Sequence, residues 1–461
     1  MTLILCGFSG LLAAFGYIAQ FHFHDSTLFF IALSSLVISS LSIISEKWNL
    51  VYLLRFVLLI VPGILTSYLL QTQPIGTIVM NYAALIQTRE ISIYVALLTA
   101  LALSGHGVGW AASRELFKTR PIATSLESET ISVYFWFYLV IAIISSTFLS
   151  IILGPFIWDS SYTALHNPPP FGFGSYNFFV AVSLLGAFLS LIYENNISKF
   201  KLFIFTATII YSLFFCMLFR GMRSEFVGVW VGLTTLFLLR YRVQLKGWQI
   251  ISVFVGGYIF VMGWGAFRAS ASSGFKFTDA LIYMQSRVRT YDYFGNYLFQ
   301  TSTFGDIAAT LYNSITLLAK DAISPLNGQS YFDYALRTLP QIIYPDRPRD
   351  LSFIFYDNYV PYGGGIFELS EAYLNFLMPG CFFIPAIISF GIGRVYFYTV
   401  QARTFTSFFA TGVLTAALFR GTLYQSFVFY RALTVFFVLH LTAMIIDNVI
   451  KRWFENEKKI N

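Results

Sequence analysis

Arginine dominates the positive charge on one side of the predicted membrane spans. Apart from Arg55, which lies inside a span, that side carries eleven arginines against the two lysines Lys276 and Lys320. A guanidinium group binds phosphate through two parallel hydrogen bonds and stays charged in a partly dry site, where a lysine ammonium is less suited. The pattern therefore predicts a phosphate or pyrophosphate ligand. The eleven are Arg89, Arg220, Arg223, Arg268, Arg287, Arg289, Arg337, Arg347, Arg349, Arg420 and Arg431.

Several of these arginines lie at the ends of apolar stretches or within them. Arg431 falls about one turn inside the last stretch, near enough to Arg420 to share a pocket with it. A cation at such a depth is costly, so it normally faces the interior of a helix bundle or water and marks a functional site. The alternative is that each side chain reaches the lipid headgroups. The other members of this group are Arg220, Arg223 and Arg268.

Acidic side chains accompany the arginines. Asp346, Asp350, Glu368 and Glu371 cluster where the longest loop returns to the membrane, and Glu225 follows a pair of arginines. A carboxylate in such a place can accept a proton from a hydroxyl nucleophile. Structural pairing with a neighbouring arginine is the alternative role for each of these acids.

Familiar cofactor and metal motifs are missing from the chain. It has no P-loop, no dinucleotide fingerprint, no GxSxG elbow and no HExxH, which argues against ATP hydrolysis, flavin chemistry and zinc proteolysis. His22, His24 and Asp25 have a spacing that suits a metal, although a polar turn at the membrane interface explains the same residues. Asp346 and Asp350 enclose two arginines, which disfavours a divalent cation there. We expect neither a metal nor a cofactor.

Apolar helices must hold these residues in place. Of the 461 residues 57% are hydrophobic and 11% are charged, whereas about one-quarter of a soluble protein is charged. This composition excludes a soluble enzyme and predicts an all-α polytopic membrane protein. About twelve stretches are long enough to cross a bilayer core of about 30 Å, although the eighth and eleventh are short and could pack inside the bundle. They cover residues 3–20, 27–44, 50–70, 91–112, 131–153, 177–193, 202–219, 226–239, 250–267, 377–400, 407–419 and 427–450.

The distribution of lysine and arginine predicts the orientation of the spans. One set of short connections carries fifteen cations and the opposite set carries four. Because short loops rich in lysine and arginine stay in the cytoplasm, both termini are expected there. The net charge of +7 largely reflects this distribution, so we do not expect nucleic-acid binding.

The spans divide the chain into three parts. Residues 1–267 form a bundle of nine spans, and residues 268–376 form one long outward loop with short helices, including a helical pattern from Thr278 to Leu298. Residues 377–461 form the last three spans and a cytoplasmic tail. The loop is long enough to fold into a small subdomain on the membrane face.

Taken in order, several short motifs resemble those of the Wzy-type polysaccharide polymerases, which include the O-antigen and enterobacterial common antigen polymerases. The topology covers the whole chain, and the motifs lie between Arg220 and Arg431. One difference is Leu377, which stands where the family often has glycine. The motifs are the turn Gly221-Met222-Arg223, the segment Tyr344-Pro345-Asp346-Arg347-Pro348, and the segment from Gly363 to Phe376 followed by Pro379-Gly380.

The resemblance implies a GT-C-like glycosyltransferase of the bacterial inner membrane that uses no metal and no nucleotide sugar. Such an enzyme transfers a growing glycan from undecaprenyl pyrophosphate to the non-reducing end of a new lipid-linked repeat unit. The reaction takes place at the periplasmic face, with inversion expected at the anomeric carbon. A chain-length regulator and a flippase in the same membrane are implied as partners.

The resemblance also implies roles for individual residues. Arg223 takes the place of the family's turn arginine, Arg347 that of its Pro-x-Arg/Lys-Pro segment, and Glu371 that of its Glu-x-Tyr-x-Asn segment. Arginines would offset the charge that develops on the departing pyrophosphate. Glu371 is the first candidate for the base that activates the acceptor hydroxyl, with Glu368 and Glu225 in reserve. The candidates for pyrophosphate or substrate binding are Arg220, Arg268, Arg287, Arg289, Arg337, Arg349, Arg420 and Arg431.

Two other functions remain open from the sequence. An O-antigen ligase, which moves finished polymer onto lipid A core, shares the expected fold and the arginine-rich loop. A lipid-linked glycan flippase or secondary transporter is the alternative from another class. Transporters usually have broken helices, charges at mid-membrane and internal repeats, whereas this chain concentrates its polar residues in one outward loop.

Overall fold

The computed structural model describes most of the chain. The described residues are 1–19, 22, 24–47, 49–72, 89–116, 128–153, 176–194, 197–220, 222–250, 303–339, 344–358 and 365–460, with scattered positions between 252 and 264. Every regular element within these ranges is a helix. The helical prediction is therefore confirmed for the described part of the chain.

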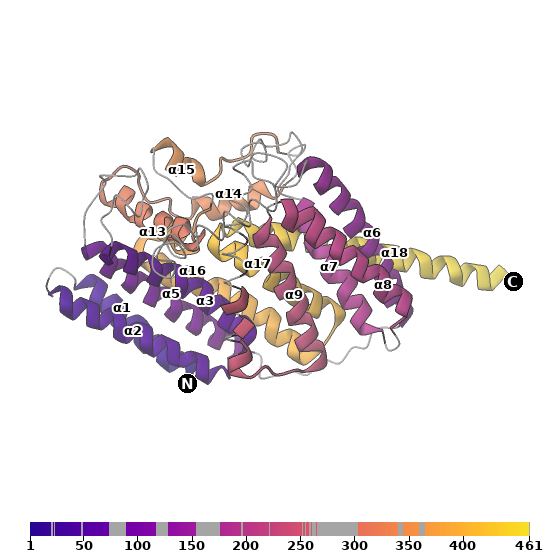
Figure 1. Ribbon diagram of the computed structural model, residues 1–461, viewed down its shortest axis with the longest axis horizontal. Helices are drawn as coiled ribbons and strands as arrows, with labels where there is room; N and C mark the ends of the chain where they lie inside the picture. The colour runs from indigo at the N-terminus through magenta and orange to yellow at the C-terminus, as the bar shows by residue number, and fades with distance from the viewer. Residues whose placement is uncertain are drawn as a thin grey trace, which may run out of the picture.

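The helices keep the labels of Figure 1. They are α1 (Thr2–Ile18), α2 (Asp25–Ser45), α3 (Leu50–Thr72), α5 (Arg89–Glu115), α6 (Ser128–Leu153), α7 (Tyr176–Tyr193), α8 (Lys199–Ile209), the π-helix η3 (Ile210–Met217), the 3-10 turn η4 (Leu218–Arg220), α9 (Arg223–Tyr241), α13 (Thr303–Ala319), α14 (Gln329–Arg337), α15 (Ser352–Asp357), α16 (Glu368–Ala402), α17 (Phe405–Leu423) and α18 (Phe427–Ile460).

Seven helical segments among the described residues are long and apolar enough to cross a membrane. This finding is consistent with a helical membrane protein. The predicted eighth and eleventh spans correspond to α9 and α17, which pack against each other, and most residues of α17 are buried. The predicted ninth span, 250–267, lies mostly outside the described residues. The seven are Asp25–Ser45, Ile93–Glu115, Ile131–Ile152, Tyr176–Tyr193, Lys199–Arg220, Glu368–Ala402 and Phe427–Trp453.

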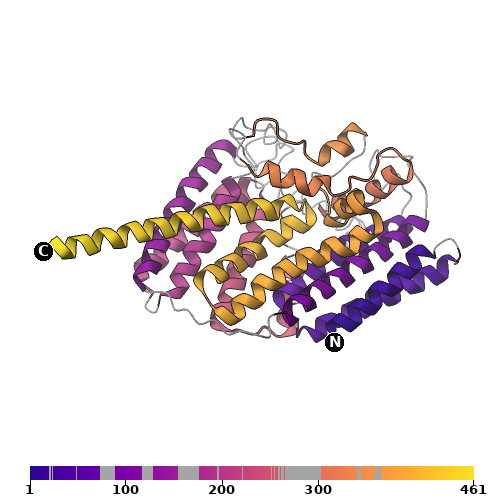
Figure 2. The ribbon, with the colours of Figure 1, turned by 180° about the vertical axis from the view of Figure 1, so that it is seen from behind.

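The three short helices of the long loop gather at one end of the bundle. Figure 1 shows α13, α14 and α15 together at the top, while the N-terminus lies at the bottom. We call the end with these helices the loop end. Figure 2 shows that the C-terminal part of α18 extends beyond the bundle. The predicted helical pattern from Thr278 to Leu298 lies outside the described residues.

The helices α5 and α16 pack in close contact with each other. A Cβ atom added at Gly105 would lie 2.1 Å from the carbonyl oxygen of Phe382, and one at Gly109 would lie 2.0 Å from that of Ala386. Only glycine allows two helices to approach this closely, and small residues are the usual means of packing helices in membranes. This contact brings the α5 side chains next to those of α16.

The helix α16 is in fact two helices that turn back on each other at Leu377. Leu377 has φ 56° and ψ −147°, which no helical residue adopts. The thiol of Cys381 approaches the carbonyl oxygen of Leu369 at 3.8 Å, so the short helix 368–376 runs back beside the long helix 378–402. The last of the three predicted parts of the chain, 377–461, begins at this turn. Glu368 and Glu371 therefore enter the bundle instead of lying in the loop.

Replacing Leu377 by glycine is expected to stabilise the protein. Leucine at a positive φ stores strain of about 1–3 kcal/mol, which glycine avoids because it has no Cβ atom. The Leu377→Gly variant should therefore raise the thermal unfolding midpoint of the purified protein in detergent. Ile387→Gly is the matched control, since Ile387 is an exposed residue inside the long helix, where glycine costs about 1 kcal/mol. An unchanged or lower midpoint for Leu377→Gly would contradict the argument.

Candidate functional site

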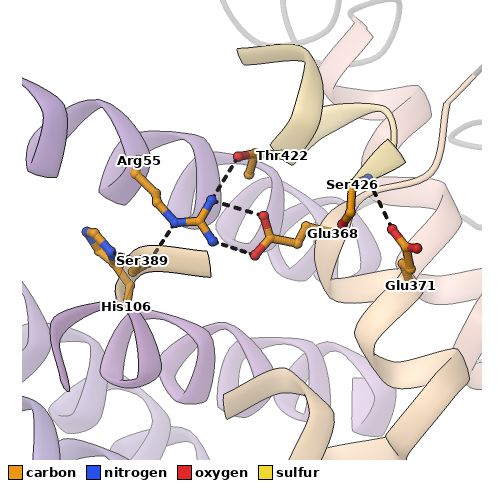
Figure 3. Close-up of polar contacts among 7 residues, drawn as sticks. All are labelled: Arg55, His106, Glu368, Glu371, Ser389, Thr422 and Ser426. Atoms are coloured by element: carbon orange, nitrogen blue, oxygen red, sulfur yellow. Dashed lines mark hydrogen bonds and ion pairs between the residues drawn. The ribbon is translucent and has the colours of Figure 1, made fainter. Parts of the chain in front are cut away.

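A fully buried ion pair joins α3 to the tip of the short helix 368–376. The guanidinium of Arg55 binds both carboxylate oxygens of Glu368, at 2.6 and 3.0 Å, and the two side chains are 1% and 0% exposed. Arg55 also donates to the hydroxyls of Ser389 at 2.7 Å and Thr422 at 3.1 Å (Figure 3). The pair thus connects α3, both helices of α16 and the end of α17.

A buried histidine extends this network. His106 Nδ1 lies 2.8 Å from the hydroxyl of Ser389, and its Nε2 lies 3.1 Å from the carbonyl oxygen of Tyr52. Because a carbonyl only accepts, Nε2 must carry the hydrogen, which leaves Nδ1 of the neutral ring as an acceptor. The Ser389 hydroxyl accepts from Arg55 and can donate its single hydrogen to His106. Each member of the network is therefore satisfied without an additional charge.

Glu371 lies one helical turn beyond Glu368 and has only neutral partners among the described residues. Its carboxylate accepts a hydrogen bond from the hydroxyl of Ser330 at 3.1 Å and from the backbone N–H of Ser426 at 3.2 Å. Asn375 donates to the hydroxyl of Ser330 at 2.8 Å, which orients that hydroxyl. Glu371 is completely buried. It is a carboxylate that no described arginine or lysine neutralises.

Asp350 lies next to the same region and pairs with Arg337. The distance from Arg337 Nη1 to the carboxylate is 2.7 Å, and Gln425 donates to the other oxygen at 2.7 Å. The backbone N–H and the hydroxyl of Ser352 donate to that second oxygen as well. Burial alone would raise the pKa of Asp350, but Arg337 and these hydrogen bonds outweigh it and lower the pKa.

Four arginines converge around the start of α18. The positive charges of Arg337, Arg420 and Arg347 all act on Arg431. The guanidinium carbons of Arg431 and Arg337 lie 4.2 and 5.0 Å from the centre of the Phe427 ring, within the range of cation–π contacts. Arg420 therefore lies close enough to Arg431 for their charges to interact, and the two loop arginines Arg337 and Arg347 do so as well. The pocket predicted to be shared by Arg420 and Arg431 stays a prediction. We call these four residues the arginine cluster.

Two members of the arginine cluster have no carboxylate partner in the part of the chain that the structure describes. Arg347 donates from Nη2 to the carbonyl oxygen of Leu339 at 2.6 Å, and its buried Nε has no hydrogen-bond partner there. Burial and the charge of Arg337 lower the pKa of Arg347. Arg431 has no described ion pair either. Within the described residues, no carboxylate therefore neutralises either of these two guanidinium groups.

Arg420 forms an ion pair with Glu225 at the head of α9. Asn177 donates to the same carboxylate oxygen at 3.1 Å, and Ser224 binds the other at 2.5 Å. The pair borders a cavity of about 30 Å³ between α7, α9, α17 and α18, whose lining is mostly apolar. This volume holds about two water molecules. Glu225 therefore pairs with an arginine, which is the structural role given above as the alternative to catalysis for each acid.

Three consecutive residues, the last two of the α17–α18 connection and the first of α18, connect these groups. Gln425 binds Asp350, the backbone of Ser426 binds Glu371, and the ring of Phe427 contacts two arginines of the cluster. Adjacent residues of a chain lie 3.8 Å apart at their Cα atoms. The arginine cluster and the buried Glu371 are consequently neighbours at the loop end of the bundle.

Other predicted site residues lie elsewhere. Arg349 is exposed and faces Asp357 at 3.7 Å, and Arg220 donates from Nε to the carbonyl oxygen of Phe215 at 3.2 Å. Arg223 is the first residue of α9. His24 accepts from the backbone N–H of Ser26 at the start of α2, as expected of a polar turn. Arg268, Arg287 and Arg289 lie outside the described residues.

Sequence reasoning missed the residues that surround the carboxylates. Arg55 lies inside a predicted span and is not among the predicted site residues. The cost of a cation in such a place nevertheless indicates that it has a buried partner. Ser330, Gln425 and Ser426 gave no signal at all, because serine and glutamine are common in any loop. Their role depends on helices that are remote in the chain.

The Arg337–Asp350 pair gives a testable pH dependence. Because the folded-state pKa of Asp350 lies below its ordinary value of 3.8, its contribution to stability is complete above that pH and is lost as the pH falls through the folded pKa. At neutral pH, Asp350→Asn should lower the free energy of unfolding by about 1–3 kcal/mol and therefore lower the thermal unfolding midpoint. The midpoint of the variant should then decrease less in acid than that of wild type. Asp346→Asn, at an exposed position, is the control. Equal acid profiles for wild type and Asp350→Asn would refute the pairing.

Comparison with known proteins supplies no identity for this chain. No family model, no curated protein and no solved structure matches it. The resemblance to the polysaccharide polymerases therefore rests on the motifs of the sequence alone, and the function has to be argued from the site.

Proposed function

We propose that this protein polymerises lipid-linked oligosaccharide repeat units as a Wzy-type glycosyltransferase. The donor is a glycan on undecaprenyl pyrophosphate, and the acceptor is the non-reducing end of a new lipid-linked unit. The surface polysaccharide formed is an O-antigen or a related polymer. The proposal starts from the sequence motifs and is supported by the arrangement at the loop end.

The observation that carries the proposal is the arginine cluster beside Glu371. Asp350 and Glu225 pair with Arg337 and Arg420, whereas no described carboxylate pairs with Arg347 or Arg431. The cluster thus has an excess of two positive charges. A pyrophosphate leaving group carries negative charge that grows as the anomeric bond breaks, so fixed guanidinium groups stabilise the transition state more than the ground state.

Glu371 supplies the second half of the proposed chemistry. Within the described residues no cation pairs with it, so no ion pair opposes its taking a proton. In the proposed reaction the acceptor hydroxyl attacks the anomeric carbon, its proton passes to Glu371, and the glycosyl–oxygen bond to pyrophosphate breaks. Glu368 and Glu225, the reserve candidates, are each held by an arginine, which favours Glu371.

The wider setting of the enzyme is part of the same proposal. About twelve spans in a GT-C-like arrangement place both termini in the cytoplasm and the loop end in the periplasm of the bacterial inner membrane. The long loop then covers the site from outside. A flippase that delivers the lipid-linked units and a chain-length regulator are the proposed partners.

The test is a reaction of purified protein in detergent with undecaprenyl-pyrophosphate-linked repeat units, read as a glycan ladder. Wild type should form a ladder, and Arg347→Lys and Arg431→Lys should reduce its rate about 10- to 100-fold, because lysine keeps the charge but loses the fork of donors. Arg242→Lys is the control, since Arg242 is exposed after α9 at the end opposite Glu225.

Other outcomes separate the alternatives. Transfer of polymer to lipid A core without chain extension would identify a ligase. Movement of intact lipid-linked units across vesicles, without any new glycosidic bond, would identify a flippase. A ladder formed at the wild-type rate by both lysine variants would remove the cluster from the reaction.

Glu371→Gln tests the proposed base. Glutamine has nearly the same shape and can still bind Ser330 and Ser426, but it cannot take the proton. We expect kcat to fall about 100- to 10,000-fold while KM changes little. Ser330→Ala is the comparison, because it removes one hydrogen bond and keeps the carboxylate, and its kcat should fall much less. Similar kcat values for Glu371→Gln and wild type would exclude the assignment.

A further inference from the structure

The Arg55–Glu368 pair lies at a depth where charges are expensive. Both side chains are excluded from solvent, and four of the five guanidinium hydrogens are directed at Glu368, Ser389 and Thr422. A buried ion pair of this kind seldom increases stability over apolar side chains of the same volume. Stability alone therefore does not account for the ion pair, which also fixes the position of the helices that it joins.

The pair fixes how far the short helix 368–376 enters the bundle. In one straight helix Glu368 and Ser389 would lie about 31 Å apart, at 1.5 Å per residue. Here one guanidinium binds both of them, because the chain reverses at Leu377. Arg55 thus joins the tip of the short helix to the middle of the long one (Figure 3).

Glu371 depends on this anchor because it follows Glu368 by three residues on the same helix face. Arg55 also binds Thr422 near the end of α17, and the backbone of Ser426 just beyond that end donates to Glu371. The same two segments are therefore held together at two neighbouring points. If the contacts of Arg55 with Glu368 and Thr422 are lost, the carboxylate of Glu371 is expected to move relative to Ser426 and Ser330.

We infer that the Arg55–Glu368 ion pair is a positioning device for Glu371, which sets the depth and rotation of the short helix. This inference rests on the proposed function for its catalytic readout. Arg55 and Glu368 do not touch the reacting atoms, so they act only through the placement of Glu371. Their effect should appear in kcat and not in substrate affinity.

The experiment compares Arg55→Met, Glu368→Leu and the double variant. Each single change leaves one member of the pair as an unpaired buried charge and should lower the thermal unfolding midpoint, whereas the double variant removes both charges of the pair and should recover it. The double variant should nevertheless polymerise with a kcat about 100-fold below wild type and a similar KM. Arg114→Met, which breaks the ion pair with Glu46 near the C-terminal end of α5, is the control and should keep its kcat. A stable double variant with wild-type kcat would overturn the inference.

A second readout does not require the proposed activity. Ser330→Ala removes a hydrogen bond to Glu371 and should lower the unfolding midpoint in the wild-type background but not in the double variant, where Glu371 is displaced. An equal effect in both backgrounds would overturn the inference. If wild type forms no ladder but the effect depends on the background, the positioning role stands and the proposed polymerase activity fails.

Discussion

The buried contact between Arg55 and Glu368 constrains how four helical segments meet. Each partner would be strongly destabilising alone, since an unpaired charge in such a place costs about 3–5 kcal/mol. The pair can form only if α3, both parts of α16 and the end of α17 meet at one point. The packing of the first helices, including the close approach of α5 to α16, has to satisfy this requirement.

The turn at Leu377 makes that meeting possible. It returns the chain into the bundle, so that two glutamates of a loop-like sequence become buried. Buried backbone outside a helix still needs partners for its polar groups. Ile366, just before the short helix, donates its N–H to the carbonyl of Tyr424 at 2.6 Å, which meets this requirement from the α17–α18 connection.

The acids of the site differ in their partners, and this difference has chemical meaning. Glu368, Glu225 and Asp350 each have an arginine, and such a carboxylate serves structure. Glu371 has hydroxyl and amide donors instead. Among the arginines, in turn, Arg347 and Arg431 form no ion pair with a described carboxylate. The proposed polymerase reaction uses this difference, because it requires a base for the acceptor hydroxyl and cations for the pyrophosphate.

The sequence by itself determined that the chain forms long apolar helices, as a helical membrane protein does. Long apolar stretches can satisfy their backbone polar groups in a membrane only as helices or closed barrels. The phosphate ligand expected from the arginine preference stays a prediction. Only the tertiary structure decided which charges pair. Arg55 and Glu368 are 313 residues apart, and no local pattern predicts a contact over such a distance. The reversal at Leu377 was also hidden, because a leucine does not indicate a positive φ as a glycine would, yet the arrangement of the buried carboxylates depends on it.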